Sequence, residues 1–147
     1  MTGRGRARRA DPGIPDTGVP DLPGVTRFDL VCGEGMDATA QDLARGWCND
    51  RAVPRTAADG IVTLVAAALR HGLRFGPRAV AIGLRWLDPD RVAVDVRWRG
   101  CSRVTGSTAA DTRDLESTAA AFDALSESWG LRILTPDPVH WFVVDTA

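Results

Sequence analysis

The feature that most constrains the fold is a pair of apolar runs on either side of the short segment Asp88-Pro89-Asp90. Every second residue in both runs is apolar. These positions are Val80, Ile82, Leu84 and Trp86 in the first run and Val92, Val94, Val96 and Trp98 in the second. Residues with a period of two share one face of a strand, and a turn that contains proline between two such runs is typical of a hairpin. The pattern therefore predicts an antiparallel strand pair with one buried face.

Two helices are predicted before this hairpin. They cover residues 37–51 and 56–72, because apolar residues recur there at spacings of three and four and so form one stripe on each helix. Asp37 is expected to cap the first helix. Gly72 is expected to end the second helix, in the place after a helix that glycine favours.

The remaining segments complete the fold class. We expect a strand at residues 25–31, a third helix at 112–129 with Trp129 on its apolar side, and a final hairpin of residues 131–134 and 140–144. The order β-α-α-β-β-α-β-β predicts an α+β two-layer sandwich. In this arrangement three helices cover one face of a mostly antiparallel mixed sheet, and residues 25–147 form a single domain.

Residues 1–24 differ in composition from the rest of the chain. Four arginines lie in the first ten residues, and prolines and glycines alternate after them. Such a segment buries little apolar surface, so we expect a disordered tail. A docking arm or a weak nucleic-acid contact is the alternative. The rest of the chain is mildly acidic, so the domain itself is not expected to bind nucleic acid.

Composition excludes several classes of protein. The 147 residues are 44% hydrophobic, as in soluble globular proteins, and no apolar run reaches the roughly 18 residues that span a bilayer. The three cysteines, Cys32, Cys48 and Cys101, are odd in number and widely spaced, which indicates reduced thiols and a cytoplasmic location. Histidine and cysteine spacings typical of zinc ligands are missing, so no metal is expected.

Residues 63–72 resemble a pattern of a known family. They read Thr-Leu-Val-Ala-Ala-Ala-Leu-Arg-His-Gly, which is similar to Glu-Leu-Val-x-Asn-Ala-x-x-His-Gly in the anti-sigma-factor serine kinases of actinobacteria. Three later segments also resemble that family: Phe122-Asp123-Ala124-Leu125, Ser128-Trp129-Gly130-Leu131 and His140-Trp141-Phe142-Val143. Over about residues 28–144 the chain thus resembles the histidine-kinase-like ATPase fold.

The same comparison implies that the residues for ATP chemistry are lost. Ala67 stands where the family has the Asn that binds Mg²⁺, and Thr63 stands where it has the Glu that acts as general base. A methyl group cannot coordinate Mg²⁺, and a hydroxyl is too weak a base near neutral pH. His71 matches a family position, and at a helix end we interpret it as a capping residue.

Two further positions of the nucleotide pocket are also changed. The adenine-binding Asp of the family closes a strand that has a period of two, and Trp98 occupies that position here. Glu116 lies where the family has a glycine-rich lid, and its charge would repel phosphate. Thr63, Ala67, His71, Trp98 and Glu116 therefore mark a degenerate nucleotide pocket, in which Trp98 is expected to fill the space of the adenine. The alternative is that Trp98 points to solvent or to a partner.

The resemblance therefore implies a non-catalytic regulatory module with no catalytic residues, no metal and no Mg-ATP cofactor. Its partner would be a sigma factor, an anti-anti-sigma-like protein or another regulator of transcription, and it could form a homodimer. The alternative is an ATP-binding serine/threonine kinase with displaced ligands, for which Glu116 and Asp114 are the nearest carboxylates. A third possibility is a pocket for another small ligand.

Overall fold

The computed structural model of the chain describes residues 24–102, 109–132 and 137–147, and the side chains of all these residues except 109–115. These described residues form five strands and three α-helices. In chain order the elements are β1 (Thr26–Val31), α1 (Met36–Asp50), α2 (Arg55–Gly72), the 3-10 turn η2 (Leu73–Phe75), β2 (Ala79–Asp88), β3 (Arg91–Arg99), α3 (Ala109–Leu125), β4 (Ser128–Arg132) and β5 (Val139–Asp145). The predicted order of elements is confirmed.

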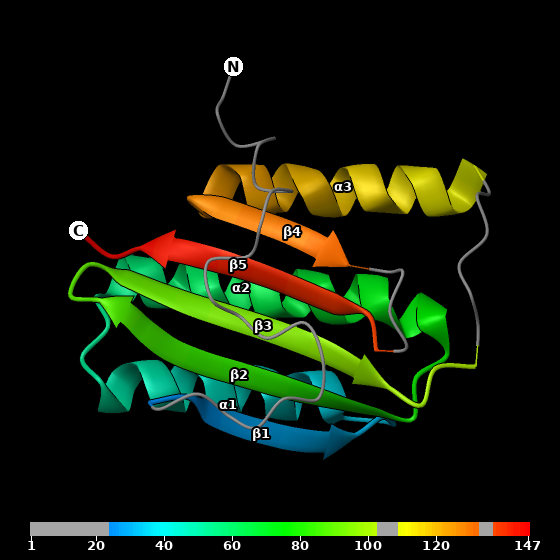
Figure 1. Cartoon of the computed structure of the whole chain (residues 1–147), viewed down its shortest axis with the longest axis horizontal. Helices are drawn as coiled ribbons and strands as arrows, with labels where there is room; N and C mark the ends of the chain where they lie inside the picture. Colours follow the sequence, from blue (N-terminus) through cyan, green and yellow to red (C-terminus); the bar gives the residue numbers. More distant parts are fainter. Residues whose placement is uncertain (1–23, 103–108, 133–136) are drawn as a thin grey trace.

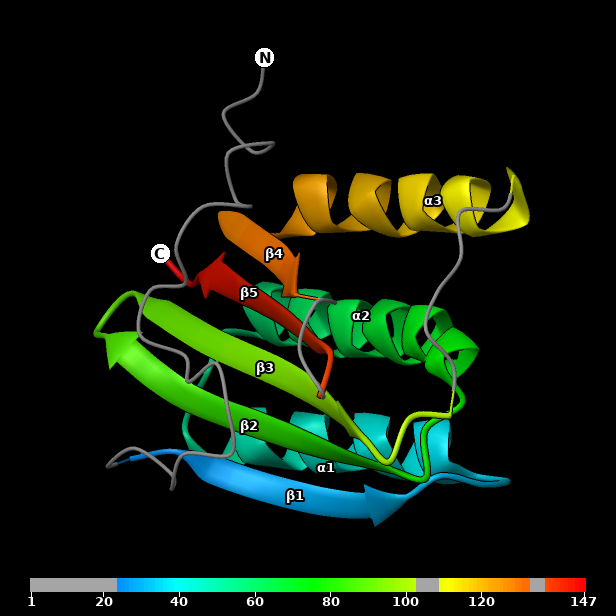
Figure 2. The ribbon, with the colours of Figure 1, turned by 45° about the vertical axis from the view of Figure 1, so that its right-hand side comes forward.

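The strands form a single sheet in the order β1-β2-β3-β5-β4. Helices α1 and α2 lie behind it in the view of Figure 1, and α3 runs along the side of β4 (Figures 1 and 2). The predicted hairpin is present, with Val80 opposite Trp98 and Trp86 opposite Val92. The α+β two-layer architecture is therefore confirmed.

The sheet is antiparallel at every pairing among the described strands, so the expectation of a mixed sheet was wrong. The cause is the position of the last hairpin. Strand β5 lies between β3 and β4 and is antiparallel to both. It therefore separates the two neighbours that run in the same direction.

The third helix ends earlier than expected. Helix α3 stops at Leu125, and Trp129 belongs to β4, where it pairs with Phe142. The Ser126 hydroxyl donates a hydrogen bond to the Phe122 carbonyl, and the Glu127 amide donates to Val143 across the sheet. Strand pairing thus replaces helical bonding at this point, although Trp129 keeps the apolar contact with Phe122 that the helical pattern suggested.

The second helix ends at Gly72, as predicted, but Gly72 does not have the conformation expected of a glycine that ends a helix. Gly72 keeps helical angles, with φ −70°, and the chain continues through η2 to Gly76, which has φ +62°. Gly76 is therefore the glycine in the left-handed conformation that ends a helix. Gly72 has another role, because a Cβ atom at this position would overlap the indole of Trp98.

The core lies between the helices and the sheet. Each helix contributes one apolar stripe, and the strands contribute the alternate residues that the sequence pattern indicated. At the centre Ile61, Leu64, Val94 and Val96 are completely closed to solvent. No helix in the described ranges is long and apolar enough to cross a membrane.

The face of the sheet that carries no described helix is also buried at its centre. Asp95 and Arg97 point to this face, and they are only 4% and 2% exposed. The expectation that the hairpin buries one face was therefore wrong. Asp95 forms an ion pair with Arg27 on β1 at 3.3 Å, which balances part of its charge on this face.

Candidate functional site

The five residues of the predicted pocket do not form one open site. Ala67, His71 and Trp98 are buried, on α2 and at the end of β3. Thr63 and Glu116 are exposed, on α2 and α3. The carboxylate of Glu116 is thus in solvent, and the side chain of Asp114 lies outside the described residues.

Trp98 fills the space between the end of β3 and the end of α2. Its side chain has no exposed surface, so the alternative in which it points to solvent was wrong. The indole lies directly against the backbone of Gly72. Burying an aromatic side chain of this size stabilises a fold substantially, because it removes a large apolar area from water.

The Trp98 indole begins a chain of buried hydrogen bonds. Its Nε1 atom lies 3.2 Å from Nδ1 of His140, and Nε2 of His140 lies 2.9 Å from Nδ1 of His71. An indole N–H can only donate. Nδ1 of His140 must therefore accept, Nε2 of His140 carries its proton, and Nδ1 of His71 accepts. The direction of the chain fixes His140 as a neutral ring with a defined tautomer.

Burial strongly affects the acid–base behaviour of His140. Loss of solvation, together with the neighbouring His71, lowers the pKa of His140 from 6.5 to about 3. A charged imidazolium would also lose its role as acceptor for Trp98. His140 is thus neutral near pH 7, and its side chain is buried, at 2% exposed.

Aromatic rings pack around the cluster formed by Trp98, His140 and His71. Phe75 and Phe122 pack on His140, with ring centroids 6.4 and 6.3 Å away. Both phenylalanines are buried. The sequence analysis gave no role to His140, although its period of two with Phe142 and Val144 places it on the core face. The pairing of His71 with His140 had no signal in the sequence, because the residues are 69 positions apart.

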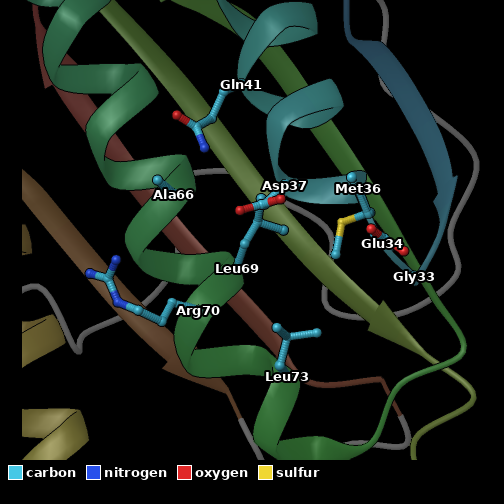
Figure 3. A pocket seen from close by; sticks show the side chains of 10 residues that line it. Gly33, Glu34, Met36, Asp37, Gln41, Ala66, Leu69, Arg70 and Leu73 are labelled. Atoms are coloured by element: carbon cyan, nitrogen blue, oxygen red, sulfur yellow. The ribbon is translucent and has the colours of Figure 1, made fainter.

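A pocket of about 350 Å³ lies elsewhere, between the start of α1 and the second half of α2. The turn Gly33-Glu34-Gly35 and the first residues of α1 form one wall, and α2 and η2 form the other (Figure 3). Its lining residues are Gly33, Glu34, Gly35, Met36, Asp37, Gln41, Ala66, Leu69, Arg70 and Leu73. The expected turn at Gly33-Glu34-Gly35 is present, but the sequence analysis did not predict the pocket.

The chemistry of this pocket is mixed. Glu34 and Asp37 are exposed carboxylates on the α1 side, and Arg70 is exposed on the α2 side. Leu73 is 51% exposed, which is unusual for a large apolar residue that follows a buried helix. Asp37 and Gln41 extend from α1 toward α2, and Leu73 lies at the lower end of the pocket (Figure 3). The arrangement can hold an apolar side chain while polar groups surround it.

In the part of the chain that the structure describes, no three His, Cys, Asp or Glu side chains come together as ligands that could hold a metal ion. The three cysteines are free thiols. Burial raises the pKa of the Cys48 thiol to about 11, so this group is a poor nucleophile near neutral pH.

Comparison with known proteins does not assign a function to this site. The chain matches no protein-family model and no curated protein.

Proposed function

We propose that the protein is a non-catalytic protein-binding module, related to the anti-sigma-factor serine kinases and built on a degenerate histidine-kinase-like ATPase domain. The observation that carries this proposal is the packing of Trp98. An indole that is fully buried, held by His140 and in contact with Gly72 occupies the position that the resemblance gives to the adenine-binding Asp. A nucleotide base would need this space.

The pocket between α1 and α2 supports protein binding. Its volume of about 350 Å³ is at the lower end of the range for ligand sites. An apolar anchor from a partner would contact Leu69 and Leu73, and polar or basic groups beside it would face Glu34 and Asp37. A buried anchor residue with a polar rim is the usual arrangement of interface hot spots. A sigma factor, an anti-anti-sigma-like protein or another cytoplasmic regulator of transcription is the partner implied by the resemblance.

Calorimetry with Mg-ATP and Mg-ADP at millimolar concentration tests the first part of the proposal. We expect no saturable heat, since Ala67 offers no Mg²⁺ ligand and Trp98 fills the adjacent space. A 1:1 isotherm in the micromolar range would instead support the alternative, an ATP-binding serine/threonine kinase with displaced ligands.

A pair of surface variants tests the second part. Leu73 and Leu125 are both exposed leucines, at 51% and 41%, but only Leu73 lines the pocket. We expect Leu73→Asp to lose a partner that the wild-type chain retains in affinity purification from its native host, and Leu125→Asp to keep it. Both variants should change the free energy of unfolding by less than about 0.5 kcal/mol. Equal retention by both variants would contradict the pocket as the docking site.

A further inference from the structure

The interface between α1 and α2 pairs opposite charges at one end and keeps them apart at the other. At the first end the Arg45 guanidinium on α1 forms an ion pair with Asp59 on α2, at 2.9 Å. About two turns back along α1, Asp37 extends toward α2 across the pocket, and Arg70 lies on the α2 side (Figure 3). Among the described residues, Asp37 and Arg70 form no ion pair with each other or with any other side chain. The pocket therefore lies between two opposite charges that remain available to a partner.

The floor of the pocket is an apolar stripe. Ala66, Leu69 and Leu73 are spaced by three and four residues, so they share one face of α2 and its continuation into η2. At a rise of 1.5 Å per residue the stripe is about 10 Å long, or about two helical turns. Ala66 is small and half-buried, and Leu73 is exposed. An α-helix of a partner can therefore lie along the stripe with its own apolar residues in contact with it.

The two rims of the pocket carry opposite charge. Glu34 and Asp37 are exposed on the α1 rim, and Arg70 is exposed on the α2 rim. Within the described part of the chain Glu34 also has no ion-pair partner. A docked helix with charges of a single sign would be repelled at one rim, because like charges brought together at an interface oppose binding.

The placement of the charges favours a helix over a small ligand. Met36 and Leu69 are buried in the pocket, whereas its charged groups lie at the rims. A small molecule seated beside these two residues would meet mainly apolar groups. An α-helix with its side chains is about 10–12 Å across, so its two flanks can reach both rims at once.

We infer that the partner segment bound by this pocket is an amphipathic α-helix with basic side chains on one flank and acidic side chains on the other. The inference rests on the proposed function, which makes the pocket a protein-docking site, and it adds the chemistry of the partner. Apolar residues at positions i, i+3 or i+4, and i+7 of the helix contact Leu69 and Leu73. The basic flank faces Glu34 and Asp37, and the acidic flank faces Arg70.

The first test selects ligands from a display library of random peptides of about 16 residues, roughly four helical turns. Peptides are retained if they bind the full wild-type chain and fail to bind the full-length Leu73→Asp variant, so that binding depends on the pocket. We expect the retained peptides to share the helical spacing of apolar residues, with Lys or Arg on one flank and Asp or Glu on the other.

The outcomes separate this inference from the proposed function. Retained peptides that lack the helical spacing or the two charged flanks would overturn the inference and leave the pocket as a docking site. A selection in which no peptide depends on Leu73 would overturn both.

The second test measures the affinity of one retained peptide for charge variants of the full chain. Asp37→Lys and Arg70→Glu should each weaken binding at least about fivefold at low salt, because each turns attraction at one rim into repulsion. Asp42→Lys and Arg55→Glu are the matched controls, since these exposed residues lie on the same two helices but do not line the pocket. The controls should change the affinity less than about twofold. Equal changes in test and control variants would overturn the contacts with the rims.

Discussion

On the helix-covered side of β3, Trp98 is closed to solvent by neutral groups, whereas on the other side Asp95 and Arg97 are closed to solvent as charged groups. The first side is held by apolar packing and by one directed chain of hydrogen bonds. Among the described residues, the second carries the ion pair of Asp95 with Arg27 and a small apolar cluster around Trp141. Equal burial therefore does not mean equal chemistry, and the two sides should respond differently to mutation and to pH.

The largest effect is expected on the helix-covered side. Trp98→Ala removes a fully buried indole and the hydrogen bond to His140, and it should lower the free energy of unfolding by about 3–5 kcal/mol. Urea denaturation measures this loss. The variant should still bind no Mg-ATP in calorimetry, because Ala67 remains. A loss below about 1 kcal/mol would show that the space around Trp98 collapses easily.

The next effect is a dependence on pH. The pKa of His140 is lowered to about 3 in the folded chain, so the unfolded chain takes up a proton first as the pH falls below 6.5. The contribution to stability is therefore complete above pH 6.5 and is lost between pH 6.5 and 3. We expect this residue to account for about 3 kcal/mol of the loss between pH 7 and pH 4.

A matched variant separates this effect from the titration of carboxylates. In His140→Gln the amide can still accept from Trp98 and donate to His71, but it does not titrate in this range. As the pH falls, the wild type should lose more of its free energy of unfolding than His140→Gln does, so the difference between them should change in favour of the variant. A constant difference from pH 7 to pH 4 would mean that His140 does not control this response.

On the helix-free side, Asp95→Ala should cost about 2–3 kcal/mol at neutral pH, because it leaves the half-buried Arg27 and the buried Arg97 with less negative charge nearby. The measurement is urea denaturation at low and at high salt. Asp88→Ala is the control, since Asp88 is in an exposed ion pair with Arg91, and it should cost less than about 1 kcal/mol. Equal losses of unfolding free energy in the two variants would mean that the burial of Asp95 does not increase its contribution to stability.

The smallest effect compares one glycine from each side. A Cβ atom at Gly72 would overlap Trp98, and one at Gly130 would overlap Trp141. Gly72→Ala and Gly130→Ala should each destabilise by about 1–3 kcal/mol through overpacking. Gly46→Ala on α1 has open space around it and serves as the control. We expect Gly72→Ala to cost more, because a Cβ atom there would overlap the Trp98 ring more closely than a Cβ atom at Gly130 would overlap Trp141.

Much of the fold could be predicted because periodicity is a local signal. The hairpin from Ala79 to Arg99 and the helices α1 and α2 follow patterns that depend only on neighbouring residues. Trp129 misled the prediction, since its contact with Phe122 fits helical spacing even though it lies on β4. The end of α2 at Gly72 was predicted correctly, but the sequence does not show that Gly72 keeps helical angles and is needed for contact with Trp98.

The site was harder to predict, since it depends on distant residues. The burial of Trp98 followed from its period of two with Val94 and Val96. The hydrogen bonds among Trp98, His140 and His71 could not be derived, because no local pattern brings β5 beside α2. The pocket between α1 and α2 depends on how two helices pack, and the exposed Leu73 was the one sequence position that could have suggested it.

The contact between Gly72 and Trp98 also has a consequence for how such chains diverge. A bulky residue can enter position 98 only while position 72 has no side chain, and position 72 can gain a side chain only after the indole has become smaller. The two positions should therefore change together among descendants of this sequence. A library in which both positions are randomised should recover pairs whose combined volume is nearly constant, and few with both residues large.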